Sequence, residues 1–79
     1  MIKVLLFGTF AKEAGSKVVE LEAKGEGQTL GDIIDEIRET YIKGDVGIYM
    51  MAVNEEQATP DRIINDGDEV AIMPPFSGG

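Results

Sequence analysis

The chain of 79 residues is strongly acidic, with fifteen Asp and Glu against seven Lys and Arg and a formal net charge of −8. A chain this short forms one small domain. Because it contains no Cys and no His, it has neither a disulfide nor the usual ligands of a zinc site. The negative charge repels phosphate backbones and anionic lipids, so we expect no nucleic-acid partner and no membrane partner. A basic protein surface would be attracted, and solubility alone is the other reason for such a charge.

The longest apolar runs, residues 4–7 and 48–53, fall far short of the roughly 20 residues that a membrane helix requires. Nothing near Met1 resembles a signal peptide. We therefore expect a cytoplasmic protein.

The first part of the chain has the pattern of two strands. Residues 2–8 form an apolar strand, residues 10–15 a short turn or helix, and residues 17–23 a second strand that alternates apolar and acidic side chains. We expect these strands to pair as a hairpin. The Gly25-Glu26-Gly27 run then breaks the chain.

An amphipathic helix follows. Thr29 is a suitable N-cap, Asp32 completes a capping-box-like pair, and apolar residues recur at helical spacing up to Tyr41. We expect the helix to end near Gly44.

The last part of the chain predicts short strands. Residues 48–53 predict a buried strand, 54–56 a turn, 57–59 a short strand that stops at Pro60, 65–67 a turn, and 68–73 the final strand. The crossover through the helix allows the final strand to lie centrally and parallel to the first. These elements predict an α+β fold of the β-grasp (ubiquitin-like) type, a mixed four- to five-stranded sheet packed on one main helix, spanning residues 1–73.

The chain ends in an extended tail, residues 74–79, which reads Pro74-Pro75-Phe76-Ser77-Gly78-Gly79. The prolines fix φ and stiffen the exit from the last strand, whereas the terminal glycines have no Cβ to obstruct passage through a narrow channel. A frayed terminus without function is the plain alternative.

Strand alternation also predicts an exposed apolar patch. If Ile2, Val4 and Leu6 face the helix, Leu5 and Phe7 point to the other side of the sheet, where Ala71, Met73 and Phe76 would join them. We expect Leu5, Phe7 and Met73 to form a partner interface beside the tail. Coverage by loops, or a strand parity shifted by one residue, is the alternative.

The chain resembles the ubiquitin-like sulfur carriers, and within them the small subunit of molybdopterin synthase, the MoaD type. The similarity spans the whole chain and rests on four runs, namely Met1-Ile2-Lys3-Val4-Leu5, Ala52-Val53-Asn54, Asp66-Gly67-Asp68-Glu69-Val70-Ala71 and Pro74-Pro75-Phe76-Ser77-Gly78-Gly79. Thiamine-pathway carriers share Asp-Gly-Asp and Gly-Gly but typically lack the Pro-Pro pair.

This resemblance implies that an E1-like adenylating enzyme uses ATP to activate the carboxylate of Gly79, and that a sulfur donor converts it to a thiocarboxylate. The tail would then enter the large catalytic subunit of molybdopterin synthase and deliver sulfur to the cyclic pyranopterin precursor. Phe76 would anchor beside the channel mouth. The chain itself would be a non-catalytic sulfur donor that binds no cofactor.

Three other functions stay open: a thiamine-pathway sulfur carrier, a protein modifier joined to lysines through Gly79, and an interaction module with an inert tail. The acidic runs at residues 55–56 and 66–69 could suggest a metal or acid–base site, but they lack the ligand spacing of a calcium loop. We interpret them as turns and assign no metal.

Overall fold

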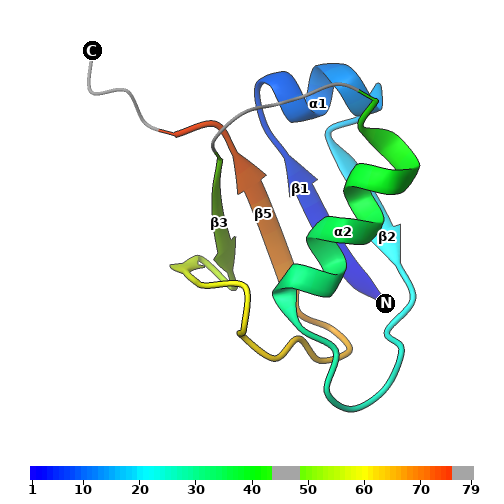
Figure 1. Ribbon diagram of the computed structural model, residues 1–79, viewed down its shortest axis with the longest axis vertical. Helices are drawn as coiled ribbons and strands as arrows, with labels where there is room; N and C mark the ends of the chain where they lie inside the picture. Colours follow the sequence, from blue (N-terminus) through cyan, green and yellow to red (C-terminus); the bar gives the residue numbers. More distant parts are fainter. Residues whose placement is uncertain (44–48, 76–79) are drawn as a thin grey trace.

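The computed structural model describes residues 1–43 and 49–75 and combines one sheet with two helices (Figure 1). Along the chain the elements are β1 (Ile2–Leu6), α1 (Thr9–Ala14), β2 (Val18–Leu21), α2 (Leu30–Tyr41), β3 (Met50–Val53), β4 (Glu56–Gln57) and β5 (Glu69–Met73).

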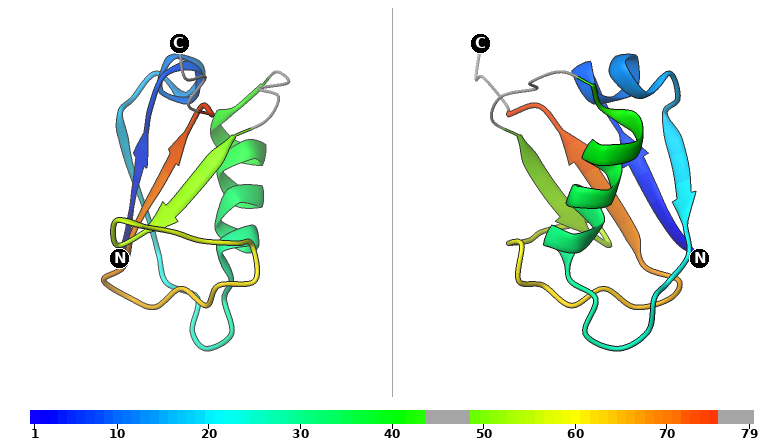
Figure 2. Two further views of the ribbon diagram at one scale, coloured as in Figure 1. Left: turned by 90° about the vertical axis from the view of Figure 1, so that its left-hand side faces the viewer. Right: turned by 45° about the vertical axis from the view of Figure 1, so that its right-hand side comes forward.

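The five strands form one mixed sheet in the order β2-β1-β5-β3-β4. The central pair, β1 and β5, is parallel, and every other neighbouring pair is antiparallel. The long helix α2 lies against one side of this sheet (Figure 2). The predicted central place of the last strand, parallel to the first, is therefore confirmed, as is the mixed sheet on one main helix.

The core lies between α2 and the sheet. Alternate residues of β1 and β5 and one face of α2 are buried together, which is the burial expected for strands with one covered face. Their side chains are those of Ile2, Val4, Leu6, Val70, Ile72, Leu30, Ile33, Ile34 and Ile37. Since full burial of one such aliphatic side chain contributes about 1.5–3 kcal/mol, this layer dominates the stability of a small domain.

Helix α2 begins where its sequence predicts. The backbone N–H of Asp32 donates to Thr29 Oγ1 at 3.2 Å, and the N–H of Thr29 donates to Asp32 Oδ2 at 3.0 Å, which completes the capping box. The predicted end near Gly44 is wrong for the helix, which stops at Tyr41. Ile42 is already extended and buried in the core, so packing ends the helix before the glycine does.

The first two strands pair antiparallel as predicted, and α1 stands where a short turn or helix was expected at residues 10–15. Strand β3 is only partly buried, which corrects the prediction of a buried strand. Val53 is its one fully buried residue, because α2 covers a single side of the sheet and alternate residues face the other side. The predicted strand start at Ile48 lies outside the described residues.

The fourth strand is Glu56–Gln57, one residue earlier than predicted and shorter. Asn54 and Glu55 have positive φ, 51° and 70°, which are the values of a two-residue type I′ hairpin turn. Pairing therefore resumes directly at Glu56, opposite Val53.

Candidate functional site

The tail leaves the sheet from its middle. Strand β5, which is flanked by β1 and β3, ends at Met73, and Pro74 and Pro75 follow as exposed residues outside any strand (Figure 1). Phe76, Ser77, Gly78 and Gly79 lie outside the described residues, so their roles stay predictions. The same holds for the boundary between a domain of residues 1–73 and a tail of residues 74–79.

Gly8 holds the start of the tail in place. It has φ 56° and ψ −127°, and the N–H of Phe10 donates to the carbonyl oxygen of Phe7 at 3.1 Å, which closes a type II′ turn around it. A Cβ on residue 8 would lie 2.6 Å from Pro74 Cγ. Only glycine fits this turn without displacing Pro74. In the sequence, Gly8 is recognisable only as a glycine at the end of an apolar strand, and this pattern does not predict its contact with Pro74.

Leu5, Phe7 and Met73, the predicted interface residues, lie on the sheet side opposite α2. The strand parity is confirmed, because Ile2, Val4 and Leu6 are almost fully buried whereas Phe7 is 46% exposed. Leu5 lies opposite Ala71 in the parallel pair, and the N–H of Phe7 donates to the carbonyl oxygen of Ile72 at 3.1 Å. We call this side of the sheet the open face.

Neighbouring strands extend the apolar part of the open face beyond the predicted residues. Val18 lies opposite Leu5 and is 43% exposed, Ala52 lies opposite Ala71, and Met50 lies opposite Met73. Sequence reasoning missed Val18 and Met50 because their place depends on the register between strands that are remote in the chain. No periodicity within one strand carries that register.

The other end of the open face is polar. Lys3 lies opposite Glu20 of β2 and opposite Glu69 of β5. Along β1 the open face therefore changes from charged at the start of the strand to apolar at its end, next to the tail.

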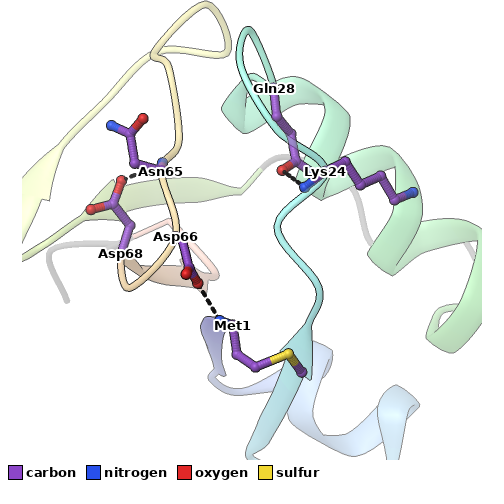
Figure 3. A network of polar contacts seen from close by, with 6 residues as sticks. All are labelled: Met1, Lys24, Gln28, Asn65, Asp66 and Asp68. Atoms are coloured by element: carbon purple, nitrogen blue, oxygen red, sulfur yellow. Dashed lines mark hydrogen bonds and ion pairs between the residues drawn. The ribbon is translucent and has the colours of Figure 1, made fainter.

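The acidic run at residues 66–69 is built into turns and strand pairing (Figure 3). The amino group of Met1 pairs with Asp66. Asp68 Oδ2 accepts from the N–H of Asn65 at 2.7 Å, and its Oδ1 accepts from Asn54 Nδ2 at 3.1 Å. These bonds confirm a turn at Asp66 and Gly67, whereas Glu69 already belongs to β5.

The same contacts lower two pKa values. The pKa of Asp66 lies below its ordinary value, first because of its hydrogen bond with the chain's amino group and then because of that group's charge. The pKa of Asp68 is lowered first by the Asn65 backbone bond and then by the bond from Asn54. Both carboxylates are thus charged at neutral pH. Asp66 joins the turn to the amino end of the chain, and Asp68 joins it to the β3–β4 hairpin.

Asn54 connects residues 52–54 with residues 66–71, two of the runs that resemble the sulfur carriers. Its positive φ suits the hairpin turn, and its side-chain oxygen accepts from the N–H of Glu69 at 3.0 Å. Its own N–H donates to the carbonyl oxygen of Glu69 at 2.8 Å. These two runs therefore form one structural unit that fixes the start of β5, the strand that leads to the tail.

Across residues 1–43 and 49–75, neither helix is long and apolar enough to cross a membrane.

The comparison with known families decides the affiliation of the chain. The model of the ThiS family matches residues 4–79, from β1 through the terminal glycines. The chain belongs to the ThiS family. As a ThiS-family protein it is a member of the ubiquitin-like sulfur carriers, which confirms the resemblance seen in its sequence.

Curated relatives of this ThiS-family chain match it over nearly its full length. The molybdopterin synthase sulfur carrier subunit of Dictyostelium discoideum is 31% identical over 81 residues, covering 98% of this chain and 94% of the relative. The protein of the same name from Chlamydomonas reinhardtii is 35% identical over 82 residues, covering 99% and 98%.

Small archaeal modifier protein 1 of Haloferax volcanii is similar in sequence and in structure. It is 33% identical over 84 residues, covering 94% of this chain and 95% of the relative. Its crystal structure superimposes with a TM-score of 0.81 at 28% identity, covering 95% and 97% of the two chains. The predicted β-grasp fold is thereby confirmed.

Proposed function

We propose that this chain is the sulfur carrier subunit of a molybdopterin synthase. The observation that carries the proposal is the similarity to proteins of that name over nearly the full length of this chain, which itself ends in Pro-Pro-Phe-Ser-Gly-Gly. The partners would be the large catalytic subunit of the synthase, an E1-like adenylating enzyme and a sulfur donor.

The chemistry of the terminal carboxylate is consistent with this role. A free carboxylate resists substitution, so an oxygen of Gly79 must first attack the α-phosphorus of ATP and displace pyrophosphate. Hydrosulfide supplied by the donor then attacks the carbonyl carbon, the bond to AMP breaks, AMP leaves, and a thiocarboxylate remains. With no Cys in the chain, no thiol competes as the sulfur carrier. The thiocarboxylate sulfur would be the nucleophile in the synthase.

The described residues of the carrier would present the tail and bind the partners. Gly8 packs against Pro74, and this contact would help to direct the chain as it leaves β5. The apolar part of the open face, with Leu5, Phe7 and Met73, lies beside that exit and provides a surface on which a partner can dock. Acid–base catalysis would belong to the large subunit, because the carrier's acidic turn residues Asp66 and Asp68 are engaged in structural bonds.

The test has two stages. The untagged chain is incubated with ATP, an adenylating enzyme and sulfide, and its intact mass is measured for replacement of one oxygen by sulfur at Gly79. The product is then mixed with a large synthase subunit and the cyclic precursor. Conversion of the precursor to molybdopterin is the expected result. A thiocarboxylate that forms but is not consumed would exclude molybdopterin synthase and leave the thiamine pathway or another acceptor.

The similarity to small archaeal modifier protein 1 favours a second candidate, a modifier joined to lysine side chains through Gly79. Conjugation would give isopeptide-linked ladders on denaturing gels when the chain is expressed with its adenylating enzyme in its own cells. Ladders that disappear when Gly79 is deleted would establish this activity.

A further inference from the structure

Met50 and Met73 lie opposite each other in the antiparallel pair of β3 and β5, on the open face and at the end of the sheet from which the tail leaves. Directly opposed residues have Cβ atoms about 4.5–5.5 Å apart, so the two thioethers are neighbours. The next pair on the same side of these strands is Ala52 and Ala71, whose methyl groups are too short to cover the longer side chains beside them. Both methionines are only partly buried.

The other two methionines have different surroundings. The chain has four methionines and no cysteine, so every sulfur atom in its side chains is a thioether. Met51 packs against the core, on the side of the sheet that α2 covers. Met1 is 54% exposed, but it precedes β1, and because β1 and β5 are parallel it lies at the end of the sheet remote from the tail. Met50 and Met73 alone combine contact with solvent and a place beside the tail.

A thioether in contact with solvent is open to oxidants of the peroxide class. A sulfur lone pair attacks one oxygen of hydrogen peroxide, the O–O bond breaks, and the departing hydroxide takes the proton that the transferred oxygen carried. One sulfoxide and one water form, so the sulfur has lost two electrons and the peroxide has gained them. Methionine sulfoxide reductases reverse the change: two thiols supply two electrons and become a disulfide, and the sulfoxide oxygen leaves as water.

Oxidation would change the open face in its apolar part. A sulfoxide is polar and its oxygen accepts hydrogen bonds, whereas a thioether packs as an apolar group. A partner that covers Met50 and Met73 with apolar atoms would leave this oxygen without a donor, and a buried acceptor without a donor weakens binding. The core would keep its packing, because both side chains lie on the side of the sheet opposite α2.

We propose that Met50 and Met73 are a site of reversible oxidation that switches the open face between a form that docks on partners and a form that does not. The oxidant is of the peroxide class, and the reductant is a dithiol methionine sulfoxide reductase. This inference rests on the proposed function, since it requires partners that dock beside the tail. Carrier activity would fall under oxidising conditions and recover after repair.

The first test maps the sulfoxides and is independent of sulfur transfer. The full chain is treated with hydrogen peroxide for increasing times, the peroxide is removed with catalase, and each methionine is followed by mass spectrometry of fragmented peptides. Met50 and Met73 should oxidise several times faster than Met51, with an unchanged circular dichroism spectrum. A methionine sulfoxide reductase with dithiothreitol should return both to thioethers. Equal rates for Met50 and Met51, or unfolding of the oxidised chain, would overturn the proposal.

The second test measures docking. Pyrophosphate release by the adenylating enzyme is followed over a range of carrier concentrations, with carrier from which the oxidant has been removed, so that neither the enzyme nor a thiocarboxylate meets peroxide. Oxidation should raise KM for the carrier by about tenfold with kcat unchanged, because the sulfoxides alter docking and leave the reacting carboxylate intact. Repair by the reductase should restore the original KM.

Leucine variants identify the responsible methionines, because leucine keeps the apolar volume and cannot be oxidised. Each variant is compared with itself before and after peroxide, so that any effect of the substitution alone cancels in the ratio of KM values. The double variant Met50→Leu, Met73→Leu retains Met1 and Met51 and should not respond to peroxide. Met51→Leu is the matched control and should respond as the wild type does. A rise of KM in the double variant equal to that of the wild type would contradict the assignment.

Failure of the proposed function has a different signature. An untreated chain that is adenylated but gains no sulfur contradicts the carrier function, and the ratio of KM values then still decides the oxidation proposal. An untreated chain that is not adenylated contradicts the proposed function and, with it, the docking on which the oxidation proposal rests. An untreated chain that gains sulfur, but whose KM is the same before and after peroxide, contradicts the oxidation proposal and leaves the carrier function standing.

Discussion

Phe7 is exposed although the residue before it in the sequence is buried, so we expect it to contribute to binding and not to folding. Its neighbours in β1, Leu6 and Val4, are buried under α2, whereas Phe7 itself is exposed on the open face close to the tail. Phe10, three residues later, points into the core and stacks edge-on against Tyr49 with ring centroids 5.4 Å apart. Two phenylalanines so close in sequence therefore lie in opposite environments, one exposed and one in the core.

Phe7→Asp should leave the fold intact and abolish binding to the tail-receiving partners. We expect its free energy of unfolding to change by less than about 1 kcal/mol, because the new carboxylate meets solvent. Phe10→Ala should instead lower it by about 3–5 kcal/mol through lost burial and a cavity. Urea denaturation and titration calorimetry measure the two effects. Unfolding of Phe7→Asp would place Phe7 in the core and contradict the interface.

Gly8 should direct the tail as well as form its turn. Gly8→Val strains a backbone with positive φ and drives a Cβ into Pro74, so we expect a loss of about 1–3 kcal/mol in stability and slower thiocarboxylate formation even in the folded fraction. Gly15→Val is the control, because Gly15 also has positive φ but has no neighbour within 4 Å of the added Cβ. Equal rates for the two variants, after correction for folding, would show that the Pro74 contact has no functional role.

The carboxylate of Asp68 should make stability depend on acid pH. Its pKa is lowered by bonds that the unfolded chain lacks, so its contribution is present above the unfolded pKa of about 3.9 and is lost as pH falls through the folded value. Asp68→Asn should therefore be less stable than the wild type at pH 7 and differ less from it at pH 2.5. Urea midpoints at the two pH values provide the measurement, and a constant difference would contradict the assignment.

At the scale of elements, the hairpin between β3 and β4 carries a residue that does not suit its position. Glu55 has φ 70° in the second position of a type I′ turn, where glycine is preferred. The strain is local, since Asn54 beside it tolerates positive φ and is tied to β5.

Glu55→Gly should therefore stabilise the domain by about 0.5–1 kcal/mol. Relief of the strain at positive φ should outweigh the cost of the extra conformational entropy that glycine gives to the unfolded chain. Glu56→Gly, one residue later in β4, should destabilise it, because that backbone is an extended strand. Thermal denaturation of the pair compares the two. If both variants lose stability, the hairpin turn does not hold Glu55 in the strained form.

Local sequence patterns predicted most of the helices and strands. The features that they did not predict are determined by packing between segments that are remote in the chain. The start of α2 followed from Thr29 and Asp32, and the burial of alternate residues in β1 followed from period 2. The end of α2 did not, because the burial of Ile42 decides it. Likewise, the Gly8–Pro74 contact and the positions of Val18 and Met50 depend on the order and register of strands, which no single segment contains.

At the scale of the whole molecule, the two sides of the sheet differ in their surroundings. The side under α2 holds the core, and the open face combines an apolar region with an exit for the tail from the central strand β5. The region that matches the ThiS family runs from β1 to the terminal glycines, so it includes both the sheet and the tail. We therefore expect that extending or shortening the C-terminal end changes the proposed carrier function without lowering the stability of the domain.

The central claim is that the carboxylate of Gly79 is the reacting group. The decisive measurement compares intact masses of the wild-type chain and of a chain with one alanine added after Gly79, each incubated with ATP, adenylating enzyme and sulfide. We expect an oxygen-to-sulfur mass shift in the wild type and none in the extended chain, with identical circular dichroism spectra. An equal mass shift in both chains would contradict the account.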